Sequence, residues 1–229
     1  MFSLRNEEEA FFIMKVLKFG GSSVGTPESI LNVKNIVEAT ARPAVVVVSA
    51  LGGVTDQLIA ASRMAAAGDS AYSESVDSLM ERHHKMVNAV IEPRHRPQLL
   101  ENLDHLLTDL RSILHGVFLI QDLTPKTADA IVAYGERLSS LITAALLDNA
   151  CHVDSLNVVC TRVQNGKTLV DFELTNHRIV EHFGKHPGCR QLDLGLPASR
   201  TVRNKFLLFI RVKLWKSLLK TAKWLISDK

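Results

Sequence analysis

The six residues 44–49 constrain the fold more than any other segment, because they contain four consecutive valines and no charge. Such a β-branched run without polar alternation predicts a strand that is covered on both faces, as in a parallel sheet. Lys15–Phe19 predicts an earlier strand. Between them, Thr26 and Pro27 predict a helix start, and apolar residues then recur at helical spacing. The order strand, helix, strand predicts a right-handed βαβ unit and an α/β fold.

A glycine-containing loop follows each of these strands. The first is Gly20–Gly25, which follows Lys18 and Phe19, and the second is Ala50–Asp56. Adjacent glycines allow the backbone to approach a ligand closely, and amides at the start of a helix favour an anion, usually phosphate. The first loop matches neither the Walker A pattern nor the Gly-x-Gly-x-x-Gly pattern, so a plain strand-to-helix turn stays an alternative. Ligands of open α/β sheets bind at the carboxyl ends of strands, and the two loops predict one rim of such a site.

The middle of the chain is predicted to be helical. We expect a helix over 56–67, a two-helix insertion over about 70–118 broken at 92–97, and a long helix over 127–149. The insertion contains several histidines without a recognisable ligand spacing, and we expect them on solvated helix faces and not in a metal site: His83, His84, His95, His105 and His115.

Gly135 and Glu136 lie inside the predicted long helix. A glycine there costs about 1 kcal/mol relative to alanine, which indicates that something approaches the helix closely. That neighbour is either a ligand or another helix. In the second case we expect Glu136 on a solvated face.

The last third of the chain changes in character. We predict a strand over 151–159, a hairpin turning at Asn165-Gly166 and a short helix over 176–183. Residues 188–229 carry ten Lys/Arg and two acidic residues, whereas residues 1–187 carry seventeen and twenty-two. The basic segment includes an amphipathic pattern from Arg211 onward, which predicts a helix. This helix would either dock on its own domain or have no partner. Binding to a membrane surface is the third-ranked alternative.

Composition limits the classes of protein to consider. The chain is 46% apolar, and no apolar run reaches the length of a membrane span. The mildly acidic body gives no reason to expect nucleic-acid binding. The three cysteines, Cys151, Cys160 and Cys189, lack metal-ligand spacing, and we expect reduced thiols in a cytoplasmic protein.

Three segments together resemble one known family: Lys18–Val24, Val47–Asp56 and Gly135–Ser139. In this order they resemble the aspartate kinase family of the amino-acid kinase fold, over roughly residues 14–176. The second segment is most similar to the bifunctional aspartate kinase–homoserine dehydrogenases. The resemblance implies an α/β three-layer αβα sandwich with a mainly parallel sheet. We expect residues 1–13 to be an extension, residues 14–187 to be the N-terminal part of this domain, and residues 188–229 to lie outside it.

The resemblance also implies a reaction and its residues. The reaction is transfer of the γ-phosphoryl group of ATP, with Mg²⁺, to the β-carboxylate of L-aspartate. Lys18 matches the lysine that neutralises the phosphoryl group, and the phosphate loop corresponds to Gly20, Gly21 and Ser22, where the family usually has threonine at position 22. The residues that match those holding aspartate are Ser49, Thr55 and Glu136.

The chain departs from the family pattern after about Pro187. The family continues with a Gly-Arg-Gly-Gly-Ser-Asp segment and regulatory domains, which are not in this sequence, and we interpret residues 188–229 as the product of a truncation or frameshift. We therefore expect an incomplete fold and little or no kinase activity from the chain alone. The alternatives are another amino-acid kinase, of the glutamate or carbamate type, and a non-catalytic fragment that binds an intact kinase. L-aspartate and ATP are the expected partners, and a homo-oligomer stays open.

Overall fold

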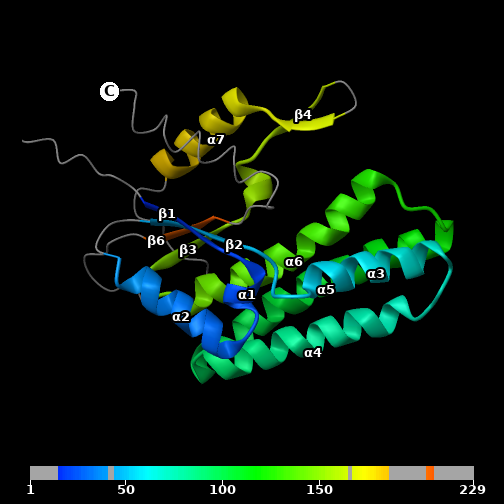
Figure 1. The fold of residues 1–229 in the computed structure, drawn as a ribbon, viewed down its shortest axis with the longest axis horizontal. Coiled ribbons are helices and arrows are strands. Elements are labelled where there is room, and N and C mark those ends of the chain that lie inside the picture. Colours follow the sequence, from blue (N-terminus) through cyan, green and yellow to red (C-terminus); the bar gives the residue numbers. More distant parts are fainter. Residues whose placement is uncertain (1–14, 41–43, 165–166, 186–204, 209–229) are drawn as a thin grey trace, which may run out of the picture.

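A four-stranded parallel sheet lies at the centre of the computed structural model, which describes residues 15–40, 44–164, 167–185 and 205–208. The strand order is β1-β2-β6-β3, and each pair of neighbours is parallel (Figure 1). The strands are β1 (Lys15–Phe19), β2 (Ala44–Val48), β6 (Lys205–Leu208) and β3 (Ala150–Val153). All five residues of β2 are buried, as the valine run predicts.

Helices cover both faces of this sheet (Figure 1). The thicker layer comprises α1 (Gly21–Val24), α2 (Pro27–Glu38), α3 (Val54–Ala66), α4 (Tyr72–Val90), α5 (Arg96–Ile120) and α6 (Pro125–Leu146). The opposite face carries α7 (Phe172–Lys185) and the antiparallel hairpin of β4 (Thr161–Gln164) and β5 (Lys167–Val170). This arrangement confirms the predicted three-layer αβα sandwich.

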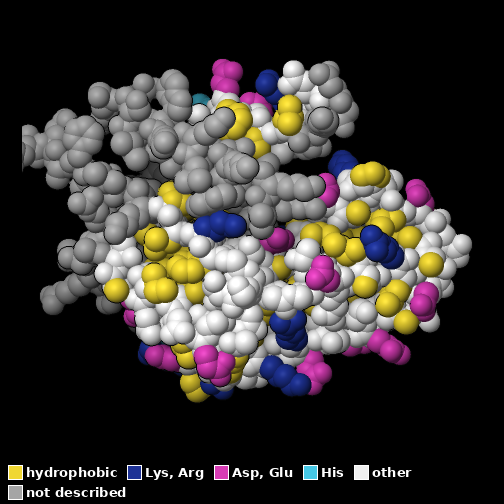
Figure 2. Space-filling model, viewed as in Figure 1, with side chains coloured by type: hydrophobic (Ala, Val, Ile, Leu, Met, Phe, Trp, Pro, Cys, Tyr) yellow, Lys and Arg dark blue, Asp and Glu magenta, His cyan; other side chains and the backbone are white. Residues whose placement is uncertain are grey.

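The thicker layer is held together by one continuous apolar core. Helix α5 contributes a stripe whose members recur every three or four residues, so they share one helix face: Leu99, Leu103, Leu107, Leu110, Leu114 and Val117. The predicted two-helix insertion is confirmed as α4 and α5, joined by the short 3-10 helix Pro93–His95. In the view of Figure 2, acidic and basic side chains are interspersed over the surface of this layer.

Side-chain caps fix where two helices begin. The Thr26 hydroxyl accepts a hydrogen bond from the Ser29 N–H at 3.2 Å, and the Ser29 hydroxyl accepts one from the Thr26 N–H at 3.0 Å. This reciprocal capping box starts α2 at Pro27. Thr124 caps α6 in the same manner by accepting from the Thr127 N–H. Helix α2 begins at the predicted residue, whereas α6 begins at Pro125, two residues before the predicted start at Thr127.

Several boundaries differ from those predicted. The loop after β1 contains the single turn α1, and α7 begins four residues before the predicted start at Asn176. Strand β3 ends at Val153, because Asp154 accepts a hydrogen bond from the Leu156 N–H and turns the chain into the 3-10 helix Ser155–Asn157. The predicted hairpin is confirmed, with Gln164 opposite Lys167, although its turn at 165–166 lies outside the described residues.

Strand β6 was not predicted from the sequence. Its four residues pair with β2 on one side and with β3 on the other, so β6 joins the two parts of the sheet. Residues 1–13 and the helix predicted from Arg211 lie outside the described residues. Among the helices that are described, none is long and apolar enough to cross a membrane.

The cysteine expectation is half right within the described part of the chain. Cys160 is a free, buried thiol, as expected. Cys151 is disulfide-bonded in the structure, so its prediction as a reduced thiol is wrong.

His83 of α4 is not on a solvated face, and that expectation is wrong. The side chain is completely buried. Its Nδ1 lies 2.7 Å from the carbonyl oxygen of Leu79, to which it donates a hydrogen bond in the neutral form. Burial lowers the pKa of His83 to about 4 from its ordinary value of 6.5, because the charged imidazolium cannot be solvated in the core. The sequence did not reveal the burial of His83, because both polar and apolar residues surround it in the helical pattern.

This buried histidine predicts a pH-dependent stability. In the unfolded chain His83 binds a proton near pH 6.5, whereas in the folded chain it does so only near pH 4. Above pH 6.5 His83 is neutral in both states, so the free energy of unfolding has its full value there. As the pH falls from 6.5 to 4, His83 should remove up to about 3 kcal/mol from the free energy of unfolding. Urea unfolding at a series of pH values measures this loss.

The matched comparison is His83→Gln with His105→Gln, because His105 is exposed on α5. The variant at position 83 should show a shallower pH dependence than wild type, whereas the variant at position 105 should follow wild type. Equal pH slopes in wild type and His83→Gln would show that His83 is not held neutral by burial.

Candidate active site

The two glycine-containing loops lie side by side at the carboxyl ends of β1 and β2. These strands are parallel neighbours, with Phe19 opposite Val48. The Ser49 N–H extends the pairing by donating to the Phe19 carbonyl oxygen at 3.1 Å. Further along, the Gly52 N–H donates to the Gly21 carbonyl oxygen, also at 3.1 Å. The predicted rim is thus one hydrogen-bonded unit, which we call the loop pair (residues 20–25 and 49–56).

Gly21 is required for this contact. A Cβ atom on Gly21 would lie 2.9 Å from the carbonyl oxygen of Ala50 and 3.4 Å from the Cα of Gly52. Both neighbours are backbone atoms, which cannot move aside as a side chain can. Gly53 has a different role, because its φ of +82° is the left-handed conformation that leads the chain into α3.

Helix α6 packs directly on the loop pair. A Cβ on Gly135 would lie only 2.8 Å from the Cβ of Ala50 and 3.2 Å from a methyl of Val54, so glycine lets the helix approach the second loop. The Ser139 hydroxyl donates to the Ser49 carbonyl oxygen at 2.8 Å and joins the two elements. For Gly135, the helix-contact alternative is therefore correct, and the close neighbours are protein atoms.

Glu136 is buried and not on a solvated face. Its exposed fraction is 4%, so the accompanying expectation of a wet helix face is wrong. Little water screens a carboxylate in this position, so its interactions with nearby charges are stronger than they would be in solvent.

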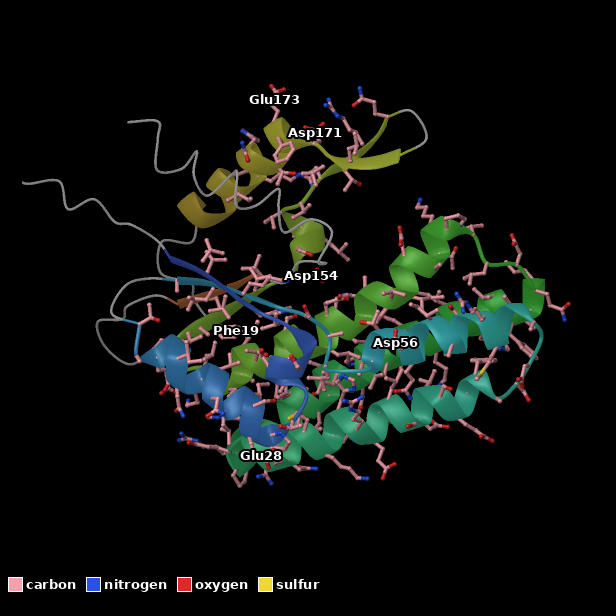
Figure 3. All side chains as sticks on the ribbon, viewed as in Figure 1. Phe19, Glu28, Asp56, Asp154, Asp171 and Glu173 are labelled. Atoms are coloured by element: carbon pink, nitrogen blue, oxygen red, sulfur yellow. The ribbon has the colours of Figure 1, made fainter. Side chains whose placement is uncertain are left out.

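The predicted site residues lie on three connected segments. Lys18 and Ser22 are exposed at the first loop, Ser49 and Thr55 are half-buried at the second, and Glu136 is on α6. Phe19 and Asp56, labelled in Figure 3, mark the ends of β1 and of the second loop. The backbone hydrogen bonds of the loop pair and the hydrogen bond from the Ser139 hydroxyl to the Ser49 carbonyl oxygen bring these segments together.

A second connection ties α6 to β3 and was missed at the sequence level. Arg137 donates from Nε to Asp154 at 3.1 Å, and its guanidinium lies 4.8 Å from the centre of the Tyr134 ring. The Ser140 hydroxyl lies 2.8 Å from Nε2 of His152, whose pKa burial lowers to about 4. The available signal was an acidic residue, Asp154, inside the strand predicted over 151–159.

No group of three or more His, Cys, Asp or Glu side chains within the described ranges could hold a metal ion. Mg²⁺ commonly keeps several waters and binds through substrate phosphates with one or two carboxylates. The described side chains do not form a protein cage for such an ion.

The close approach at Gly21 predicts that alanine substitutions at two adjacent glycines will change the stability of the protein to different extents. Gly21→Ala should lower the free energy of unfolding by about 1–3 kcal/mol, because the new methyl overlaps backbone atoms of the second loop. Gly20→Ala should change it by no more than about 0.5 kcal/mol, because no atom lies within 4 Å of a Cβ there. Urea unfolding of both variants is the measurement, and equal losses would contradict the contact.

Comparison with known proteins agrees with this arrangement. The model of the amino acid kinase family matches residues 14–183. A bifunctional aspartokinase/homoserine dehydrogenase of Daucus carota is 30% identical over 57% of the chain, and an aspartokinase of Candida albicans is 28% identical over 63%. The matches span 14% and 28% of those two proteins, so the chain covers well under half of either relative.

A solved structure shows the same fold. Escherichia coli aspartokinase III, in complex with aspartate and ADP, superposes with a TM-score of 0.69 at 20% identity, over 86% of this chain and 40% of that one. The family match covers most of the 229 residues, including all three segments of the candidate site. The chain belongs to the amino acid kinase family.

Proposed function

We propose that this chain provides the aspartate-binding part of an aspartate kinase, which transfers the γ-phosphoryl group of ATP to the β-carboxylate of L-aspartate. The observation that carries the proposal is the junction of the loop pair with α6, made by the Gly52–Gly21 and Ser139–Ser49 hydrogen bonds. It joins the three segments whose sequences resemble aspartate kinases. The relatives named aspartokinase support the same activity.

The first loop is assigned to the phosphates. Lys18 would neutralise the charge of the transferring phosphoryl group, since this reaction depends mainly on positioning and on charge stabilisation. The turn Gly20–Ser22 would contact phosphate oxygens through backbone amides and the Ser22 hydroxyl, because the first amides of a helix lack intrahelical partners. Lys18 is exposed, as a group that meets a ligand from solvent must be.

The second loop and α6 are assigned to L-aspartate. The buried carboxylate of Glu136 would pair with the substrate ammonium, because a charge-assisted hydrogen bond is strong where little water competes for it. The hydroxyls of Ser49 and Thr55 would donate to the substrate carboxylates. Ser49 immediately follows β2 and Thr55 lies in the first turn of α3, so both are placed by regular elements.

ATP would bind as its magnesium complex, with Mg²⁺ held mainly by phosphates and water. The metal would supply charge neutralisation between the phosphates when bound. The cytoplasmic location and the homo-oligomer stay predictions of the sequence.

Two substitutions should separate the two halves of the proposed site. Glu136→Gln should weaken L-aspartate binding by at least about tenfold, because a charge-assisted hydrogen bond contributes about 1.5–3 kcal/mol. Lys18→Ala should weaken binding of magnesium ATP by a similar factor. Isothermal titration of the full chain with each ligand measures both, and Glu101→Gln on α5 is the matched control for loss of an exposed carboxylate.

The titrations also distinguish the alternatives. Selective binding of L-glutamate or carbamate would indicate another amino-acid kinase. If neither L-aspartate nor ATP binds to the wild-type chain, while the chain co-purifies with an intact aspartate kinase, the proposal is replaced by a non-catalytic binding role. Circular dichroism of Glu136→Gln checks that a loss of binding does not come from unfolding.

A further inference from the structure

We propose that Arg82 of α4 is a positioning residue that fixes the second loop for aspartate binding. The inference rests on the proposed function and adds a residue that lies outside the three segments of the site. Arg82 belongs to the helical insertion, 30 positions from the loop that it contacts. Its half-buried guanidinium donates to the carbonyl oxygen of Gly52 at 2.6 Å.

The contacted peptide unit is the central one of the loop pair. The N–H of Gly52 donates to Gly21, and its carbonyl oxygen accepts from Arg82, so both polar groups of this residue are used. A trans peptide points its C=O and the following N–H in opposite directions. By fixing the Gly52 carbonyl, Arg82 therefore also fixes the direction of the Gly53 N–H.

The loop needs such an external contact because its backbone is locally permissive. Gly52 and Gly53 are consecutive, and Gly53 is exposed with a φ of +82°. Glycine has more accessible backbone conformations than any other residue, so an unrestrained Gly-Gly peptide reorients easily. A charged donor to its carbonyl favours one orientation, and Ser49 and Thr55 flank this peptide on either side.

The helix that carries Arg82 is itself firmly held. Leu79, His83 and Met86 are buried on the core face of α4, which sets the rotation of the helix. The Gln57 side-chain amide donates to the Ser75 carbonyl oxygen at 3.1 Å and links α3 to α4. Arg82 is therefore presented to the loop from a rigid element, as a positioning residue should be.

Arg82→Met tests the inference, with Arg111→Met as the matched control. Arg111 donates from α5 to the Ser73 hydroxyl of α4 at 3.0 Å, so its loss weakens the insertion without touching Gly52. Arg82→Met should speed amide hydrogen exchange in residues 49–55 of the ligand-free full chain by about tenfold. It should also weaken L-aspartate binding by about tenfold in calorimetric titration. Arg111→Met should do neither.

Rescue provides the second control. Arg82→Lys retains one charged donor and should bind L-aspartate within about threefold of wild type. The inference is overturned if Arg82→Met keeps wild-type exchange in residues 49–55, or if it loses no more aspartate affinity than Arg111→Met. If the wild-type chain itself binds no L-aspartate, both the proposed function and this inference are wrong. The titration of the wild-type chain alone shows this, whereas a failure of the inference alone is seen only with the variants.

Discussion

The contact between the loops that follow β1 and β2 is the constraint on which the candidate site depends. One hydrogen bond, from the Gly52 N–H to the Gly21 carbonyl oxygen, joins them, and the absence of a side chain at Gly21 makes it sterically allowed. The two loops carry residues with different proposed tasks, Lys18 for phosphate and Ser49 and Thr55 for aspartate. Their separation would place the donor and acceptor of the phosphoryl group on independently moving elements, whereas phosphoryl transfer depends on fixed geometry.

Two helices of the thicker layer, α6 and α4, stabilise this contact by packing on or bonding to the second loop. Helix α6 approaches the second loop closely because position 135 is glycine, and Ser139 donates to the Ser49 carbonyl oxygen. Helix α4 reaches the same loop through Arg82. The insertion is therefore more than a surface addition, because it contributes both to the core and to the conformation of the loop. Buried residues recur from Tyr72 to Val87, so α4 packs on the core along most of its length.

The sequence predicted what local patterns encode. The valine run of β2 and the Thr26 cap of α2 each determine an element from neighbouring residues, and those elements are confirmed. The position of both loops at the carboxyl ends of the first two strands predicted that they would form one rim. The burial of Glu136 and His83 could not be predicted, because it depends on helices far away in the sequence. The same holds for β6, four residues whose strand conformation depends on pairing with both β2 and β3.

The central claim is that three segments form one site for L-aspartate. Hydrogen exchange of the full chain, measured with and without saturating L-aspartate, tests this most directly. The account predicts that L-aspartate slows exchange jointly in residues 49–56 and 133–139 and in the adjoining first loop, 18–25. Slowing confined to other regions, such as the insertion helices α4 and α5, or no change at saturating L-aspartate, would contradict it.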